Sequence, residues 1–126
     1  MTVELREPLP TTLRSIATAL SMGVPHGTYS RGGGSYDWRG IVAQQRDAAF
    51  AFLRTAFEGR VQGRTIREAH SSLLPTNFPA QPIFLIVVCA AGRPEGQVRE
   101  LTAGDMLYLI TAPSGLSEGL VARRLN

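Results

Sequence analysis

The stretch from Ile83 to Ala91 is continuously apolar and rich in β-branched residues, and it constrains the fold of this 126-residue chain more than any other feature. It is about half as long as a membrane-spanning helix, so it does not predict a membrane span. A short β-branched run that begins after Pro82 and ends before a Gly-Arg-Pro turn is typical of a strand buried on both faces. We therefore expect a buried strand here.

Helical periodicity precedes this run. A first helix is expected after an N-cap at Thr11 or Thr12, because the residues that follow form one apolar stripe at helical spacing: Leu13, Ile16, Ala17 and Leu20. A third, shorter helix is expected after Thr65, which forms a Thr-x-x-Glu capping box with Glu68. Pro75 is expected to end that helix.

The second helix is expected over residues 36–58, with Ser35 as its cap. At 100° per residue, seven apolar residues share one broad face: Trp38, Ile41, Val42, Ala49, Phe52, Leu53 and Ala56. Asp47, Arg54 and Glu58 lie opposite, which predicts a wet face. The apolar surface is wider than one neighbour covers, so this helix is expected to pack on two sides.

Further strands are expected after residue 91. The segments 96–101 and 106–112 are expected to form two strands joined by a Thr-Ala-Gly-Asp turn, and segment 119–126 an edge strand that Arg123 and Arg124 protect from edge pairing. Helices that precede strands indicate the α+β class. The expected fold is one domain over residues 1–126, with about three helices in the N-terminal part and then a small antiparallel sheet of three to four strands.

Composition excludes several classes of protein. The single cysteine, Cys89, rules out an internal disulfide framework and fits a reducing compartment. Two histidines and one cysteine do not make a usual metal site, and a chain without lysine has no P-loop. The N-terminus lacks the pattern of a signal peptide. We expect a soluble cytoplasmic protein, or a virion protein if it comes from a phage, with no cofactor, no metal and no membrane partner.

The glycine-rich stretch 23–36 is expected to be a long loop that opens onto the second helix. Backbone amides at a helix N-terminus favour anions, and glycines allow close approach. The candidate anion or ligand site therefore comprises His26, Thr28, Arg31, Gly33 and Ser35. This is the basis of one alternative function, a small enzyme that binds a nucleotide or phosphorylated ligand. The plainer interpretation is a flexible connector with Ser35 as a cap.

Within this stretch, His26-Gly27-Thr28 resembles the His-Gly-Thr triplet of ADP-ribosyltransferases of the poly-ADP-ribose polymerase type. The resemblance covers three residues. It implies that His26 and Thr28 would hold the nicotinamide ribose and that Tyr108 would stack on the nicotinamide. In that family the triplet ends a strand, whereas Gly23 and Pro25 immediately precede it here.

Arginines gather between residues 54 and 67. Arg60, Arg64 and Arg67, together with Arg54, form a basic cluster that suggests a second alternative, nucleic-acid binding through phosphate contacts. No aromatic residue is interleaved with them, so stacking on bases is unsupported. The plainer interpretation is a solvated turn with local pairs to Glu58 and Glu68.

The margin of the second helix carries Phe50 and Phe57 beside Arg39 and Arg46. Aromatic side chains and arginine are enriched at protein interfaces. The function favoured by the sequence is therefore a non-enzymatic interaction or assembly module, a subunit of a homo-oligomer or of a larger particle such as a virion. The partner is expected to be a second copy or another protein subunit. Alternatively, the first helix or the N-terminal arm covers this margin within the same chain. The sequence indicates no catalytic residue.

Overall fold

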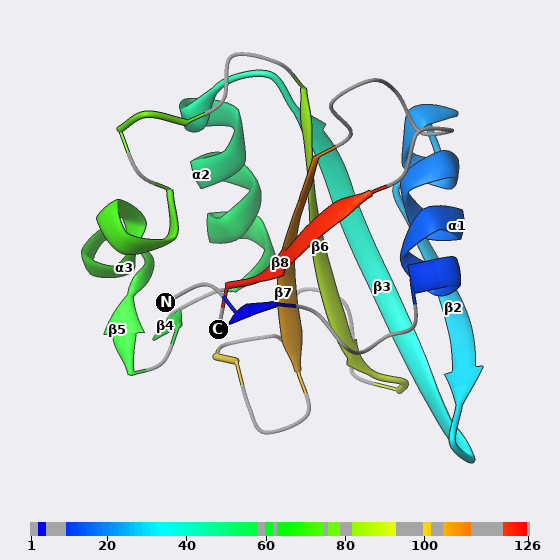
Figure 1. Ribbon diagram of the computed structural model, residues 1–126. Helices are drawn as coiled ribbons and strands as arrows, with labels where there is room; N and C mark the ends of the chain where they lie inside the picture. Colours follow the sequence, from blue (N-terminus) through cyan, green and yellow to red (C-terminus); the bar gives the residue numbers. More distant parts are fainter. Residues whose placement is uncertain are drawn as a thin grey trace.

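The computed structural model of the chain contains one antiparallel sheet of six strands (Figure 1). In spatial order the strands are β1 (Val3–Glu4), β8 (Val121–Arg124), β7 (Met106–Thr111), β6 (Ile83–Ala90), β3 (Gly34–Ala43) and β2 (His26–Arg31). A separate two-stranded sheet pairs β4 (Arg60–Val61) with β5 (Arg64–Thr65). The structure describes residues 3–4, 10–57, 60–61, 63–74, 76–78, 82–92, 100–101, 105–111 and 120–125.

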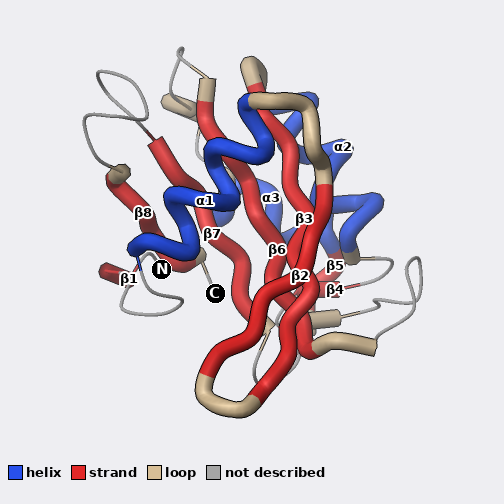
Figure 2. Tube along the Cα trace, turned by 90° about the vertical axis from the view of Figure 1, so that its right-hand side faces the viewer, coloured by secondary structure: helices blue, strands red, loops and turns tan. Residues whose placement is uncertain are grey.

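Three helices cover the two faces of the large sheet. α1 (Pro10–Ser21) lies on one face, and α2 (Arg46–Ala56) and α3 (Ile66–Leu73) lie on the other. Figure 2 shows the same layers from the side, with α1 in front of the sheet. None of the described helices has both the length and the hydropathy that crossing a bilayer requires.

β6 is the strand that joins the two hydrophobic cores, and its prediction as a strand buried on both faces is confirmed. Its side chains alternate between the two faces, as strand geometry requires. Ile83, Leu85, Val87 and Cys89 belong to the core under α2 and α3, whereas Phe84, Ile86 and Val88 belong to the core under α1. Cys89 is a buried free thiol, as expected.

The first and third helices are confirmed. The predicted stripe of α1 is buried against the sheet: Leu13, Ile16, Ala17 and Leu20. The helix begins at Pro10, so Thr11 and Thr12 lie inside its first turn and neither is the cap. The capping box of α3 is present, because the Glu68 amide donates to the Thr65 hydroxyl at 3.2 Å and the Thr65 amide donates to the Glu68 carboxylate at 2.7 Å.

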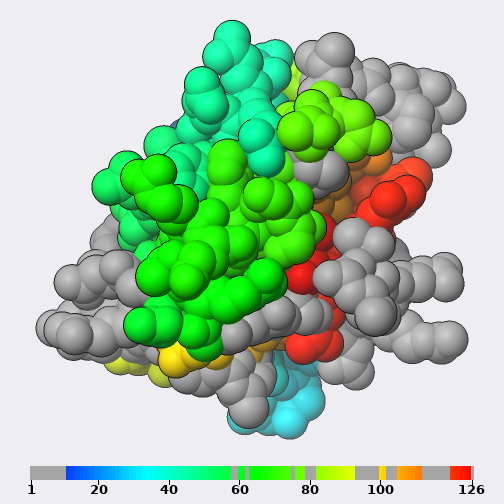
Figure 3. All heavy atoms as spheres, turned by 90° about the vertical axis from the view of Figure 1, so that its left-hand side faces the viewer, coloured from blue at the N-terminus to red at the C-terminus, as the bar shows by residue number. Residues whose placement is uncertain are grey.

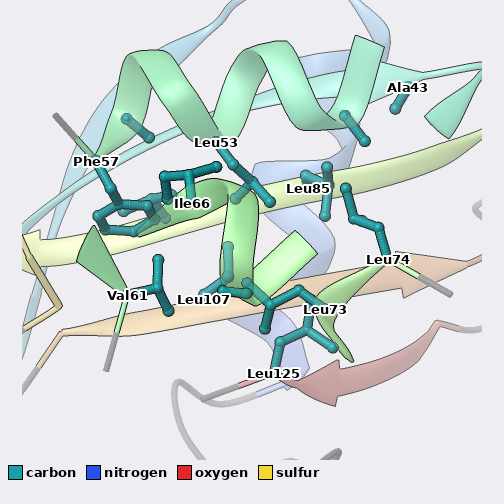
Figure 4. Packing of buried hydrophobic residues seen from close by; sticks show 14 of the residues in the cluster. Ala43, Leu53, Phe57, Val61, Ile66, Leu73, Leu74, Leu85, Leu107 and Leu125 are labelled. Carbon is teal, nitrogen blue, oxygen red and sulfur yellow. The ribbon is translucent and has the colours of Figure 1, made fainter. Parts of the chain in front are cut away.

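The core between the sheet and the helices α2 and α3 is fully apolar. Figure 4 shows Leu53 of α2, Ile66 and Leu73 of α3, and Leu85 and Leu107 of the sheet converging on one another. Complete burial of side chains of this size is worth on the order of 1.5–3 kcal/mol each. α2 and α3, which lie between β3 and β6 in the chain, therefore supply the described helical layer on this face of the sheet.

The predicted order of three helices followed by a small sheet is wrong, although the α+β class holds. Residues 36–43, expected in the second helix, form most of β3, and the helix itself is confined to Arg46–Ala56 with Gln45 as its cap. Two long strands thus precede α2, and the helices are spread along the chain. Ser35 caps no helix; it lies in β3 opposite Ser30.

The stretch 23–36 is mostly a β-hairpin rather than a loop. Six residue pairs join β2 to β3 without a bulge, from His26–Arg39 to Arg31–Gly34. The two residues of the turn, Gly32 and Gly33, have φ of 57° and 80°. A two-residue hairpin turn with positive φ at both positions is of type I′, which glycine adopts without strain.

The C-terminal strands are confirmed in part. β7 and β8 are strands, as expected from segments 106–112 and 119–126. The prediction that β8 is an edge strand is wrong over its last two residues, because Arg123 and Arg124 pair with Glu4 and Val3 of β1. The strand expected over residues 96–101 falls largely outside the described residues.

Candidate functional site

β2 is the outermost strand at one end of the large sheet, and no described strand lies beyond it. Together with β3 it forms a long hairpin that reaches past the rest of the described chain (Figure 2). All its side chains are exposed or half-buried. The other end of the sheet differs, because it is closed by β1, which is only two residues long.

The backbone groups on the outer side of β2 follow from its pairing with β3. In an antiparallel ladder, alternate residues direct their N–H and C=O groups to the neighbouring strand, and the pair that closes a two-residue turn is hydrogen-bonded. Arg31, Tyr29 and Gly27 therefore bond to β3. The same alternation makes the Pro25 carbonyl accept from the Gly40 amide, at 2.9 Å. It follows that His26, Thr28 and Ser30 direct their N–H and C=O groups outward.

The face of the hairpin that continues the α1 side of the sheet is aromatic. Tyr29 and Tyr36 stack with their ring centroids 5.2 Å apart and their planes 19° apart. Next to them the indole of Trp38 lies over Gly27, where a Cβ would be 2.7 Å from the indole Nε1. A stacked aromatic pair contributes about 0.5–1.5 kcal/mol beyond its burial, so this face stabilises the projecting hairpin.

The opposite face of the hairpin is polar. His26, Thr28 and Ser30 project from it on β2, and all three are exposed. Their partners on β3 are Arg39, Asp37 and Ser35. The outward backbone groups and the exposed polar side chains thus belong to the same three residues of β2.

The residues proposed as an anion loop are only partly brought together. His26 and Thr28 share a face of β2, but Gly33 lies in the turn and Ser35 on β3. The expected helix N-terminus is not there, because the next helix begins at Arg46. An anion held by helix amides at Ser35 is therefore wrong, and its physical basis was the misassigned helix.

The resemblance to ADP-ribosyltransferases is not supported by the position of Tyr108. This residue is fully buried in β7, and β6 and β3 separate it from β2. Its hydroxyl is 2.7 Å from the Met106 sulfur. Tyr108 therefore does not reach a ligand at His26 and Thr28, and the triplet begins a strand rather than ending one.

The four residues proposed as an interface take separate places. Phe57 is fully buried in the core beneath α2, not on a surface margin. Phe50 is half-buried and packs against the ring of His70, with centroids 4.2 Å apart. Arg39 and Arg46 donate to the carbonyls of Ala56 (3.2 Å) and Leu74 (2.6 Å), which tie α2 to its neighbours. Sequence reasoning placed them together because it continued the helix through residues 36–43.

His70 is the only described residue with a buried side-chain nitrogen or oxygen that has no hydrogen-bond partner among the described atoms, namely its Nε2. Burial lowers the pKa of His70 below its usual value, the positive charge of Arg46 lowers it further, and Asp47 raises it. The imidazole is thereby kept neutral against Phe50, so it acts as part of the packing between α2 and α3.

The arginine cluster lies on the face formed by α2 and α3, which Figure 3 shows with segment 60–74 in green. The Arg60 guanidinium donates to the Gly63 carbonyl at 2.7 Å, and Arg64 donates to the Ser72 hydroxyl at 3.2 Å. Arg67 is exposed on α3. Arg60 and Arg64 also help to lower the pKa of Glu68, after its hydrogen bonds with Thr65. These contacts match those of a solvated turn.

Among the described residues, no three or more His, Cys, Asp or Glu side chains gather closely enough to hold a metal ion. The chain matches no protein-family model, no curated protein and no solved structure. The arrangement of residues in the fold is therefore the basis for a functional assignment, and the open edge β2 is its most distinctive feature.

Proposed function

We propose that this protein is a non-enzymatic assembly subunit that associates through the open edge strand β2. The observation that carries the proposal is the outer side of β2, which no described strand pairs and where the N–H and C=O groups of His26, Thr28 and Ser30 point outward from a regular strand of six residues. Such a row of groups is a ready template for pairing with another strand.

The described edge lacks most of the devices that normally prevent pairing. Proteins blunt exposed edges with short strands, bulges, proline, lysine or inward-pointing charges. β2 is six residues long, pairs with β3 without a bulge and contains no proline, and its one residue of fixed charge, Arg31, lies at its end beside the turn. The length and regularity of β2 support it as an edge kept open for a partner.

The alternatives have weaker support from the geometry. A nucleotide-binding enzyme at stretch 23–36 would need converging groups, yet His26 and Thr28 are exposed on a strand and Tyr108 is buried. Nucleic-acid binding at Arg60, Arg64 and Arg67 would need free guanidinium groups, yet two of the three already donate to local acceptors. Neither alternative gains a specific observation from the fold.

The proposal is tested by the native mass of the full chain, measured by light scattering over a range of concentrations. We expect a mass above that of the 13.6 kDa monomer, and Thr28→Lys is expected to return it to monomer. Ser35→Lys is the matched control, because it adds the same charge to the same exposed face, on the strand that is not at the edge. A wild-type protein that stays monomeric up to about 100 µM, a concentration well above the dissociation constant of a stable oligomer, would overturn the proposal.

A further inference from the structure

We propose that the strand that pairs with β2 is β2 of a second copy of this chain, antiparallel to it, with a twofold axis at Thr28. This inference rests on the proposed assembly function and specifies its partner and its geometry. Four features of the hairpin carry it: the spacing of its outward backbone groups, the match of its polar side chains, the match of its aromatic face, and the closure that a twofold axis imposes.

The outward backbone groups fix the register. With the axis at Thr28, the outward residues of one copy oppose the outward residues of the other: Thr28 faces the partner's Thr28, and His26 faces the partner's Ser30. Each such pair exchanges two N–H···O bonds, so all the outward groups of His26, Thr28 and Ser30 are used. A slip by a single residue would oppose outward groups to inward ones, and the ladder would be lost.

Moving the twofold axis by one residue slips the register by two residues. Such a slip keeps outward groups opposite outward groups but loses part of the overlap. If the axis moved to Gly27, Ser30 would oppose Val24, which lies before β2 begins. If it moved to Tyr29, His26 would oppose Gly32 in the turn, whose φ of 57° is not that of a strand. The register centred on Thr28 is therefore the one that pairs every outward residue of β2 with another residue of β2.

The polar side chains suit this register. Cross-strand Thr–Thr pairs are favourable, and like charges directly opposite each other are not. The axis brings two threonines together and places each His26 beside a serine. No residue from 26 to 30 carries a fixed charge, so the two edges meet without repulsion.

The aromatic face matches as well. Gly27 of one copy opposes the partner's Tyr29, and the space over Gly27 already holds the indole of Trp38. The partner's Tyr29 would therefore lie beside that indole rather than over the glycine. Each Tyr29, stacked on Tyr36 in its own hairpin, would thus extend the aromatic row to Trp38 of the partner subunit.

A twofold axis also limits the size of the assembly. Isologous pairing uses the same edge on both copies, so association through β2 stops at two chains. The result is a closed dimer in which the two sheets continue into one.

Disulfide formation between engineered cysteines tests the register. Residues of a hydrogen-bonded pair have their Cα atoms about 5.5 Å apart, within the range of about 4.4–6.8 Å that a disulfide needs. Thr28→Cys is therefore expected to give a cross-linked dimer, of twice the 13.6 kDa monomer mass, under mild oxidation. The two copies of residue 26, or of residue 30, are offset by four residues, about 14 Å, so His26→Cys and Ser30→Cys alone are expected to stay monomeric on a non-reducing gel.

A mixture of His26→Cys and Ser30→Cys is expected to form the heterodimer, since these residues oppose each other. The background is Cys89→Ala; if that variant does not fold, the wild-type background serves, because Cys89 is buried. Ser35→Cys, exposed on the next strand in, is the control that is expected to stay monomeric. Cross-linking strongest at residue 26, 30 or 35 alone overturns the register but leaves assembly intact when light scattering still shows an oligomer. A monomeric mass with no cross-link overturns both proposals.

Discussion

The indole of Trp38 occupies the space that a side chain on Gly27 would need. A Cβ at residue 27 would lie 2.7–2.9 Å from three atoms of that ring, closer than real contacts allow. Trp38 itself is only 7% exposed and belongs to the core under α1. Because Gly27 on the edge strand β2 has no side chain, the indole of Trp38 on the neighbouring strand β3 can pack over it.

We expect Gly27→Ala to lower the free energy of unfolding by about 1–3 kcal/mol, because the indole must shift out of its packed position. Urea denaturation followed by tryptophan fluorescence measures it, and Trp38 is the single tryptophan. Thr28→Ala is the control, since its exposed side chain lies on the other face of β2. Equal midpoints for Gly27→Ala and the wild type would contradict the described packing.

Gly40 is a second position where backbone and helix come close. A Cβ there would lie 2.5 Å from the Leu85 carbonyl oxygen and 3.0 Å from the Leu20 side chain of α1. Gly40→Ala is therefore expected to cost about 1–3 kcal/mol of stability or more, because a backbone atom cannot yield as a side chain can. Thermal unfolding of the purified variant measures the loss; an unchanged melting temperature would show that β6 and α1 do not approach Gly40 as described.

Several elements were predictable because their local signals agree with their tertiary environment. The capping box fixes the start of α3 at Thr65, and the continuous apolar run identifies β6. The second helix was misassigned because Trp38, Ile41 and Val42 fit helical spacing, whereas in the fold they lie on a strand with a core on each face. A strand between two helical layers loses the simple alternation that marks a half-buried strand.

Thr65→Ala is expected to lower the free energy of unfolding by about 1 kcal/mol, since the Glu68 amide loses its acceptor. Equilibrium urea denaturation at neutral pH measures this loss. Thr55→Ala, at an exposed position within α2, is the control for loss of a threonine hydroxyl. A Thr65→Ala variant as stable as the wild type would contradict the capping role.

Glu68 makes the capping box sensitive to acid. Its hydrogen bonds with Thr65 lower the pKa of the carboxyl below the ordinary 4.5. Its contribution to stability is therefore present above the unfolded pKa and is lost as the pH falls through the folded pKa. The stabilities of Glu68→Gln and the wild type, from denaturation curves, are expected to differ at pH 7 and to converge as the pH falls below the folded pKa of Glu68; a difference that does not change with pH would show that the charge has no role.

His70 is expected to make stability depend on pH near neutrality, at higher pH than Glu68 does. Its pKa is lowered in the folded state, chiefly by burial, so the unfolded chain takes up the proton first as the pH falls below about 6.5. Wild-type stability is thus expected to drop between pH 7.5 and 5.5, and His70→Phe to drop less. Asp47→Asn removes the charge that raises the pKa and should steepen the loss. Urea denaturation at several pH values measures the free energy of unfolding. The same dependence of that free energy on pH in all three proteins would contradict this role.

The candidate site was harder to predict than the fold. The sequence points to stretch 23–36 through its glycines and its His-Gly-Thr triplet, not through the position of β2 at the edge of the sheet. One local signal was present, because Gly32-Gly33 between Tyr29-Ser30-Arg31 and Gly34-Ser35-Tyr36 fits a type I′ hairpin. That β2 is an edge strand depends on β3 pairing with β6, about 45 residues later, and no local pattern encodes such a long-range pairing.

The central claim, that β2 is paired by another strand in the assembled protein, is tested most directly by amide hydrogen exchange at His26, Thr28 and Ser30. Their N–H groups point outward, so in a monomer they face water and exchange rapidly, whereas Gly27, Tyr29 and Arg31 bond to β3 and serve as internal references. We predict that all three outward amides are protected at high protein concentration and lose that protection on dilution or in Thr28→Lys. Rapid exchange of these three amides at every concentration, beside protected neighbours, would contradict the account.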